Sequence, residues 1–245
     1  MRPEEDAYGE ILHAIHTGSD PEAGEIIERD DGFIQHTGSA KTYFQEYKEW
    51  SEQAQEAIQH AHGTVLDIGC GAGRHALYLQ NEKGLTVRGI DVSPKAIEVA
   101  SDRGVEKTSV AGIKDISELS ESPYDTIVML GNNLGLLGTK PIEHLNKLAD
   151  ATTENATLIG QTREATATEN PEHVQYHHYN KVRNRRPGCL RFRIRYKHFK
   201  TPFYDYLYLD KNELKEILEQ TPWKLNTTYT SEETTAYTVI LEKSR

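Results

Sequence analysis

The stretch VLDIGCGAGRHALYLQ at residues 65–80 joins an apolar run to a glycine-rich loop and then to a helical pattern. Its first four residues have the character of a buried strand, and Arg74–Gln80 repeats apolar residues at helical spacing. Gly69, Gly71 and Gly73 separate the two elements and let the backbone approach a ligand closely. Because this arrangement holds a nucleoside or a phosphate in parallel α/β sheets, the stretch predicts such a site here.

The alternation of strand and helix continues along the chain. Apolar and capping patterns predict strands at 85–91, 108–115, 124–130 and 156–164, with helices at 93–104 and 141–152. This order indicates a parallel sheet with helices on both faces. A helix at 210–220 is followed by strands at 223–230 and 235–243, whose short connection forces antiparallel pairing.

One insertion interrupts this order at about residues 164–209. It begins as a polar, aperiodic stretch. Period-two alternation over 190–197 and again over 203–210 then predicts an inserted antiparallel hairpin.

The N-terminal part follows another pattern. Residues 1–62 are predicted to form an N-terminal helical lid segment, with short helical pieces up to residue 40. From Lys41, apolar residues that include Tyr47 and Trp50 fall at the spacing of one long amphipathic helix. The ligand-binding domain then covers residues 63–245.

Composition limits what the chain can be. Its 245 residues, with a mean hydropathy of −0.68, suit one α/β domain. Residues 1–60 carry 14 acids against 4 bases and the remainder carries 24 of each, so the net charge of −10 argues against general nucleic-acid affinity. Cys70 and Cys189 cannot form a disulfide framework, and no signal peptide or membrane-length apolar run is present. We therefore expect a cytoplasmic protein without a membrane partner.

Two carboxylates indicate the kind of ligand. Asp67 precedes the first glycine, and the loop has G-x-G-x-G spacing rather than the G-x-G-x-x-G of dinucleotide-binding loops. A carboxylate facing this loop would repel a pyrophosphate and attract an ammonium group. Asp91 ends the next strand, where a carboxylate binds the ribose hydroxyls of a nucleoside. An adenosine with a cationic amino-acid tail satisfies both acids, and S-adenosylmethionine is such a molecule.

The sequence resembles the class I S-adenosylmethionine-dependent methyltransferases. VLDIGCGAGRHALYL is similar to the acid and glycine loop of that family, and GIDVSPKAIEVA is similar to its ribose-binding strand end and helix. WKLNTTYTSEETTAYTVILEK looks like its final antiparallel strand pair. The resemblance implies a Rossmann-like seven-stranded sheet with the last strand antiparallel.

The resemblance also implies site residues. The methionine part of the donor would contact Asp67, Gly69, Cys70, Gly71 and Gly73. The ribose would contact Asp91, and the adenine would lie beside Asp115 and Ile116 at the end of the third strand. Val92 is a further candidate for donor binding. The loop after the fourth strand is a frequent place for acceptor contacts in this family, and its candidates are Leu130, Gly131, Asn132 and Asn133, the first two also for donor binding.

Two residues are candidates for catalysis. Asn132 could contact the acceptor, although asparagine also caps turns. His75 could face the methyl donor, although a histidine in the first turn of a helix is also found as a partly exposed spacer. His173 and His177 have helical spacing, but no acidic ligand lies at a suitable distance in the sequence, and we expect no metal site.

The segment 181–200 is rich in bases and holds no acid. On a strand, Arg191, Arg193 and Arg195 would share one face, and the apolar residues between them would cover the core. The basic face could bind RNA phosphates, or it could pair with the acidic N-terminal segment within one molecule or across a homodimer. Internal pairing is the interpretation that we favour.

These observations lead to one expected function and two alternatives. We expect S-adenosylmethionine-dependent methyl transfer, without a metal, to a small-molecule nucleophile through its N, O or C atom. An RNA methyltransferase that uses the basic segment is the first alternative. A nicotinamide-dependent oxidoreductase is the second.

Overall fold

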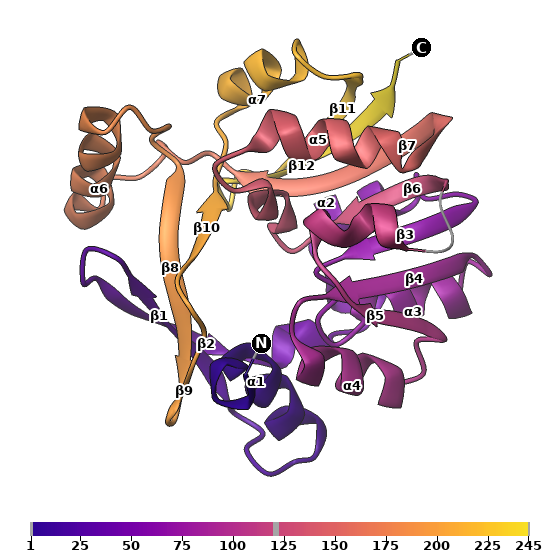
Figure 1. Ribbon diagram of the computed structural model, residues 1–245, viewed down its shortest axis with the longest axis horizontal. Coiled ribbons are helices and arrows are strands. Elements are labelled where there is room, and N and C mark those ends of the chain that lie inside the picture. The colour runs from indigo at the N-terminus through magenta and orange to yellow at the C-terminus, as the bar shows by residue number, and fades with distance from the viewer. Residues whose placement is uncertain (1, 120–122, 245) are drawn as a thin grey trace.

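The computed structural model of the protein describes residues 2–119 and 123–244, and two sheets face each other in it (Figure 1). The larger sheet has the strand order β11-β12-β7-β6-β3-β4-β5. The bounds of its strands are β3 Thr64–Ile68, β4 Thr86–Asp91, β5 Lys107–Val110, β6 Tyr124–Met129, β7 Thr152–Arg163, β11 Trp223–Thr230 and β12 Ala236–Lys243. Strands β3 to β7 pair in parallel, and β12 is antiparallel to both of its neighbours. The expected seven-stranded Rossmann-like sheet with its last strand antiparallel is confirmed.

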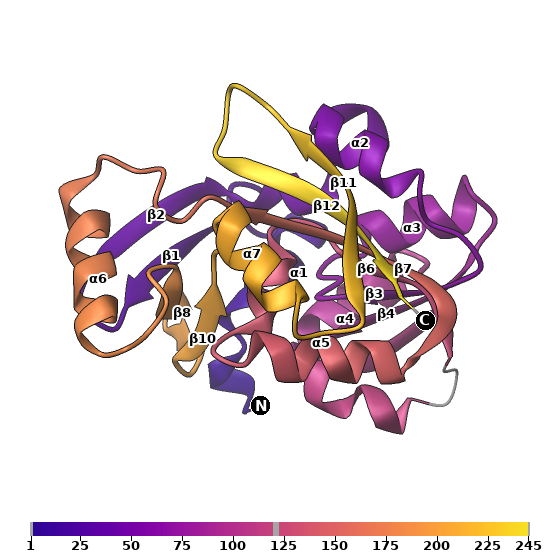
Figure 2. The ribbon, with the colours of Figure 1, turned by 90° about the horizontal axis from the view of Figure 1, so that it is seen from above.

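Helices cover both faces of this sheet (Figure 2). One layer contains α2 Glu52–Ile58, α3 Arg74–Asn81 and α4 Pro94–Asp102, and the other contains α5 Pro141–Asp150, α7 Lys211–Leu218 and the 3₁₀ helix η4 Ile113–Glu118. Successive side chains of β3 alternate between these layers: Val65 packs with the first, Leu66 and Ile68 with the second. The end of β3 therefore lies at the centre of the fold.

The second sheet joins the N-terminal part of the chain to the insertion. Its antiparallel strands are β1 Gly24–Arg29, β2 Ile34–Ser39, β8 Cys189–Tyr196 and β10 Tyr204–Leu207, with the short β9 Phe199–Lys200 beside β8. The expected pairing within 190–210 is present as β8 with β10. The expectation of helical pieces up to residue 40 is wrong for residues 24–39. These residues extend because β1 pairs with the distant β8.

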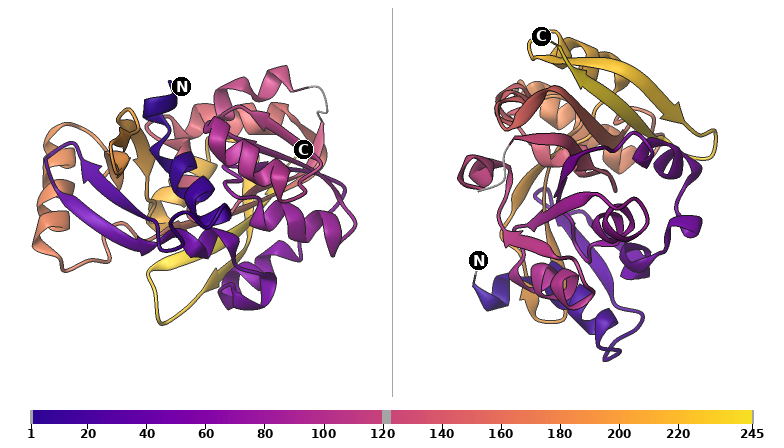
Figure 3. Two further views of the ribbon diagram at one scale, coloured as in Figure 1. Left: turned by 90° about the horizontal axis from the view of Figure 1, so that it is seen from below. Right: turned by 90° about the vertical axis from the view of Figure 1, so that its right-hand side faces the viewer.

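Before residue 40, the one α-helix within the described residues is α1 Ala7–His16. Asp6 caps α1 by accepting from the Gly9 N–H, and it also accepts from the Ser93 hydroxyl and the Lys95 N–H at the start of α4. Figure 3 shows α1 beside α4 at the junction of the two sheets. The cap of α1 thereby fastens the second sheet to the larger one.

The long amphipathic helix expected from Lys41 to residue 62 is also wrong. The chain forms two 3₁₀ turns, η2 Ala40–Phe44 and η3 Tyr47–Glu49, before α2 begins. Tyr47 stacks on Tyr78 of α3 with ring centroids 4.4 Å apart, and the Trp50 indole donates to the Gln45 carbonyl. These aromatic contacts hold Trp50 in extended backbone, and Ser51 then caps α2. The aromatic periodicity reflects packing on α3 rather than one continuous helix.

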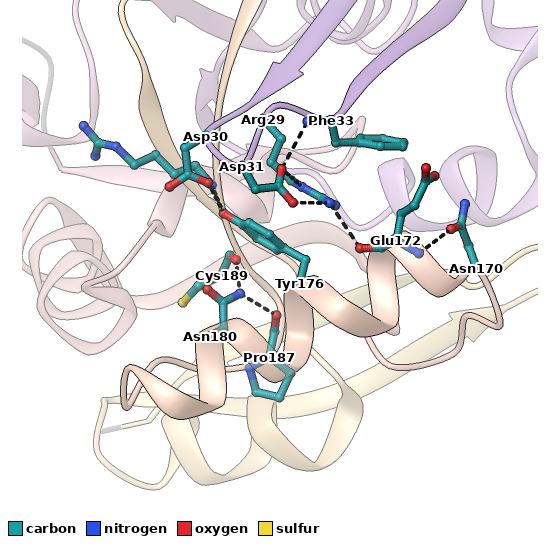
Figure 4. Close-up of polar contacts among 11 residues, drawn as sticks. Arg29, Asp30, Asp31, Phe33, Asn170, Glu172, Tyr176, Asn180, Pro187 and Cys189 are labelled. Carbon is teal, nitrogen blue, oxygen red and sulfur yellow. Dashed lines mark hydrogen bonds and ion pairs between the residues drawn. The ribbon is translucent and has the colours of Figure 1, made fainter.

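The polar stretch in the first half of the insertion contains a helix that its aperiodic sequence does not predict, α6 Pro171–Val182. Asn170 caps it by accepting from the N–H of Glu172. Near its other end, the Asn180 amide donates to the carbonyls of Pro187 and Cys189 (Figure 4). Local capping and these tertiary contacts replace the amphipathic pattern that would have signalled the helix.

Arg29 fixes α6 against the second sheet (Figure 4). Its guanidinium lies 4.0 Å from the ring centroid of Tyr176, pairs with Asp31 at 2.7 Å and donates to the Glu172 carbonyl at 3.1 Å. The Tyr176 hydroxyl donates to Asp30 at 2.6 Å. Because Arg29 and its acidic and aromatic partners are partly shielded from water, these contacts hold α6 against the second sheet.

Within the described ranges, no helix has the length and apolar character needed to cross a bilayer.

Candidate functional site

A cleft of about 1520 Å³ lies between the two sheets. One wall comes from the carboxyl ends of β3, β4 and β6, and the other from β1, β8 and β10. Parallel α/β sheets bind ligands at the carboxyl ends of their strands. Since a pocket for one drug-sized ligand measures about 300–1,000 Å³, this cleft has room for two small molecules.

The glycine loop forms the floor of the cleft beside β4. Gly71 donates its N–H to Asp91, and a Cβ on Gly71 would lie 2.6 Å from the Tyr8 hydroxyl. Gly73 begins α3 with a φ of +78°, and a Cβ there would lie 2.6 Å from Val105. The missing side chain at Gly71 thus leaves room for the Tyr8 hydroxyl against the loop, and that at Gly73 lets the start of α3 pack against Val105. Both act on loop shape, and neither lines the cleft.

Gly69 and Cys70 do line the cleft. The Asn133 amide donates to the carbonyls of Ile68 and Gly69 at 3.0 and 2.9 Å, so Asn133 ties the loop after β6 to the glycine loop. Burial raises the pKa of the Cys70 thiol well above its usual value. Cys70 is therefore a neutral wall residue rather than a nucleophile.

Asp67 lies beneath the loop instead of facing the cleft. Its side chain points to the α3 layer, where it accepts from the Ala76 backbone N–H, and it does not line the cleft. Among the described groups, its Oδ2 has no hydrogen-bond partner. Burial raises the pKa of this carboxyl to about 7, partly offset by Arg74. The strand alternation turns the Asp67 side chain toward the helix, and its contact with the donor stays a prediction.

Asp91 lines the cleft at the end of β4, as expected for a ribose-binding carboxylate. Its Oδ1 accepts from the Ser93 N–H at 2.9 Å and its Oδ2 from the Gly71 N–H at 3.1 Å. Burial raises its pKa to about 6, and the backbone donors oppose that shift. Two backbone bonds hold the carboxylate toward the cleft, and its remaining lone pairs can accept from a ligand.

The remaining donor-site candidates Val92, Asp115 and Ile116 divide into two groups. Val92 and Asp115 line the cleft, and the Asp115 carboxylate accepts from the Gly112 N–H at 2.9 Å. Ile116 is completely buried in the core and does not line the cleft. The strand end expected at Asp115 and Ile116 is wrong, because β5 ends at Val110 and these two residues belong to η4. An extended loop precedes η4, so the strand ends earlier than the sequence pattern predicted.

The loop after β6 lines the cleft at Leu130, Gly131 and Asn132. The Gln161 side chain accepts from the N–H groups of Gly131 and Asn132, and the Tyr206 hydroxyl donates to the Asn132 carbonyl. Asn132 has a φ of +65° and lies at the N-cap of a 3₁₀ helix, which agrees with the left-handed backbone of a turn residue, but its side chain makes no capping hydrogen bond. Its buried Oδ1 lacks a partner among the described groups and can accept from a ligand.

His75 is buried at the edge of the cleft rather than an exposed spacer. Its Nε2 accepts from Arg74 Nε at 3.1 Å, and its ring lies edge-on to Trp50. Burial lowers the pKa of His75 well below its usual value, with help from Arg74. His75 is thus neutral and orients Arg74, whose Nη1 donates to the Thr42 carbonyl at 2.7 Å.

The opposite wall holds functional candidates that the sequence analysis missed. They are aromatic and acidic side chains that line the cleft: Tyr8, Glu25, Tyr43, Tyr204, Tyr206 and Tyr208. The period-two tyrosines at 204, 206 and 208 could have signalled an aromatic face, because alternate residues of a strand share a side. Tyr8, Glu25 and Tyr43 had no such signal. The N-terminal segment that carries them reaches the cleft because β1 pairs with β8, which is distant in the sequence.

The basic face of β8 pairs within the molecule. Arg193 and Arg195 both bind Glu28 of β1, at 2.7 and 3.1 Å, and Arg191 binds Asp205 at 2.9 Å. The favoured internal pairing with the acidic N-terminal segment is confirmed. On the apolar face of β8, Ile194 and Tyr196 pack in a core cluster with α1, as expected, and Leu190, Phe192 and Ile194 also line the cleft.

His173 and His177 lie on α6 and line the cleft from its far end. His173 contacts the ring of Phe33 edge-on. Across residues 2–119 and 123–244, no group of three or more histidine, cysteine or acidic side chains is placed to hold a metal ion.

The fold is a Rossmann-like α/β fold, and its cleft lies at the carboxyl ends of β3 and β4, where such folds bind nucleosides. Residues 65–155 match the family model described as "Methyltransferase domain". The ribosomal protein L11 methyltransferase of Cupriavidus pinatubonensis is 34% identical over 130 residues, which are 52% of this chain and 41% of that protein. Methyltransferase GfsG of Streptomyces halstedii is 44% identical over 54 residues, 22% of this chain and 19% of its own length. The chain spans less than half the length of these curated relatives.

Solved structures extend the likeness to the whole chain. A SAM-dependent methyltransferase from Bacteroides fragilis, in complex with S-adenosyl-L-homocysteine, has a TM-score of 0.81 at 23% identity and covers 100% of this chain and 98% of its own. The 1,6-didemethyltoxoflavin-N1-methyltransferase of Burkholderia thailandensis has a TM-score of 0.52 at 15% identity, and the likeness covers 97% of this chain and 87% of that one. At these identities the likeness shows a shared fold. The match to the family model shows a methyltransferase domain at residues 65–155, as the sequence resemblance implies.

Proposed function

We propose that this protein transfers the methyl group of S-adenosylmethionine to a small-molecule nucleophile. The observation that carries the proposal is the two-walled cleft, with the family's donor-binding elements on one wall and a tyrosine-rich second sheet on the other. Its volume suits a donor and an acceptor bound side by side. When bound, S-adenosylmethionine supplies a methyl group activated by the positive charge on its sulfur.

The residues of the donor wall fit that ligand. Asp91 offers free lone pairs where ribose hydroxyls would lie, and Gly69 and Cys70 leave the floor of the cleft open. Leu130 and Val92 are the apolar wall residues suited to a flat base. Holding two reactants in a reactive orientation can supply about 7–11 kcal/mol of rate enhancement, so positioning alone accounts for much of the proposed activity.

Proton handling has few candidates in the cleft. His75 is neutral, but its Nε2 is occupied by Arg74, so we assign it to positioning. The unpaired Oδ1 of Asn132 can accept a hydrogen bond from the acceptor without removing a proton. An acceptor that enters with a free lone pair needs no base at all.

The pairing of β8 weakens the RNA alternative, since the arginines that suggested it are bound to Glu28 and Asp205. A test that separates acceptor classes uses S-adenosylmethionine labelled in its methyl group and a bacterial extract divided into small-molecule, RNA and protein fractions. We expect label in the small-molecule fraction alone. Label in RNA or in ribosomal protein would overturn the proposed acceptor class.

A further inference from the structure

Arg74 lines the cleft beside the glycine loop and has no ion-pair partner among residues 2–119 and 123–244. It follows Gly73 directly, at the first position of α3. Its Nε donates to His75 Nε2 at 3.1 Å, and its Nη1 donates to the Thr42 carbonyl at 2.7 Å. A guanidinium has five N–H donors, so these two bonds fix its orientation and leave Nη2 free to bind a ligand.

The free Nη2 lies beside the loop that follows β6. A Cβ built on Gly131 would lie 3.7 Å from Nη2, so this nitrogen is next to the backbone of that loop. Gly131 and Arg74 both line the cleft. Nη2 is therefore held at the surface of the cleft, between the segments that follow β3 and β6.

The charge of Arg74 is poorly compensated within the protein. Burial lowers the pKa of its guanidinium, and the negative charge of Asp67 opposes that shift only in part. Asp67 makes no ion pair with Arg74, because it lies under the loop, where it accepts from the Ala76 N–H. A charge that has lost water without gaining a bonded counter-ion is costly, so an anion bound in the cleft would stabilise Arg74.

The amino-acid tail of the donor carries such an anion. Asp91, at the end of β4, suits the ribose hydroxyls, and Val92 and Asp115 line the cleft on the side of η4. Because β3 lies between β4 and β6, the ends of β4 and β6 are about 10 Å apart across the glycine loop. With the ribose at Asp91 and the base toward η4, the tail would cross the glycine loop toward β6 and Arg74.

The other cations of the cleft are less suited to this tail. Three of them already have ion-pair partners in the chain: Arg29, Lys140 and Arg191. Lys114 belongs to η4, beyond β5, and Arg163 ends β7, two strands away from β3. Among the described residues that line the cleft, Arg74 is thus the unpaired cation adjacent to the glycine loop.

We propose that Arg74 binds the carboxylate of the donor's amino-acid tail and thereby selects adenosyl ligands that keep this group. The bonds to His75 and Thr42 hold the guanidinium ready for this contact. The inference rests on the proposed function and adds to it the residue that recognises the tail of the donor.

Calorimetric titration of the full chain with two ligands tests the proposal. One ligand is S-adenosylhomocysteine. The other is its decarboxylated analogue, S-adenosyl-3-thiopropylamine, which keeps the adenosine and the ammonium group. We expect the wild type to bind S-adenosylhomocysteine at least about tenfold more tightly than the analogue, because the analogue leaves Arg74 without an anion.

Variants assign this preference to Arg74. Arg74→Gln should bind the two ligands within about twofold of each other, and the ratio of the two Kd values cancels general effects of the substitution on the site. Arg74→Met, which keeps the apolar part of the side chain, gives the same test if Arg74→Gln does not fold. Arg103→Gln is the matched control, since Arg103 donates to the Ala72 carbonyl of the glycine loop but does not line the cleft. It should keep the wild-type ratio within about twofold.

A wild type that binds both ligands equally well would overturn the assignment of Arg74, and so would an Arg74 variant that keeps the tenfold preference. A wild type that does not bind S-adenosylhomocysteine would instead refute the proposed function. The first titration therefore separates the two failures.

Discussion

Asp67→Asn should change how the stability of this protein depends on pH. The Asp67 carboxyl has a pKa of about 7 in the folded protein and about 3.9 in the unfolded chain. Because the folded pKa is the higher one, the native state holds the extra proton. The stability that this group contributes is therefore present below pH ~4 and lost as pH rises through about 7.

The magnitude follows from the shift. A difference of about three pKa units corresponds to about 4 kcal/mol, and no correction for exposure applies because Asp67 is 1% exposed. Asparagine keeps the oxygen that accepts from the Ala76 N–H and removes the charge. The variant should match the wild type near pH 4.5 and exceed it by up to about 4 kcal/mol at pH 8.

Urea denaturation followed by circular dichroism, at intervals from pH 4.5 to 8, measures this difference directly. Asp102→Asn, at the exposed end of α4, controls for the loss of one carboxyl. If the stability curves of Asp67→Asn and the wild type ran parallel over this range, the assignment of Asp67 as a buried, poorly hydrated carboxyl would be refuted.

Three other predictions concern Asp91, Tyr176 and the basic face of β8. Donor binding should favour the ionised form of Asp91, whose pKa is raised to about 6, so affinity for S-adenosylmethionine should increase from pH 5 to 7 with proton release. Calorimetric heats that do not vary with the buffer's ionisation enthalpy near pH 6 would contradict this. Tyr176→Phe should cost about 1 kcal/mol through the lost bond to Asp30 and should speed amide exchange in α6; unchanged exchange would argue against the clamp. Changing Arg191, Arg193 and Arg195 together to Gln should leave RNA affinity in fluorescence anisotropy within about twofold, and a steep loss would restore the RNA alternative.

The larger sheet could be predicted because its signals are local. Each strand, glycine turn and capped helix from Val65 to Arg163 is specified by neighbouring residues, and parallel order follows from their alternation. Asp91 was placed correctly because it ends a strand whose boundary is unambiguous. Ile116 was misplaced because β5 is short and its end is not marked by a turn residue.

The second sheet could not be predicted because its pairing is long-range. Ile27 of β1 pairs with Ile194 of β8, and no local pattern records which distant strand will cover an acidic N-terminal segment. The same pairing brings Glu25 and Tyr43 to the cleft. Asp67 shows a different limit. The sequence correctly predicted that it stands near the end of a buried strand, but the side that its carboxylate faces depends on the strand alternation and on α3.

The donor site is the central claim of this account, and calorimetric titration with S-adenosylmethionine and S-adenosylhomocysteine tests it most directly. The wild type should bind both, and Asp91→Ala, with its folding confirmed by circular dichroism, should lose at least about tenfold in affinity because the ribose hydroxyls lose a charged partner. A parallel titration with NADH should give no binding. A wild type that bound neither adenosyl ligand, or an Asp91→Ala variant that bound them as tightly, would contradict the assignment of the cleft beside β3 and β4 as the donor site.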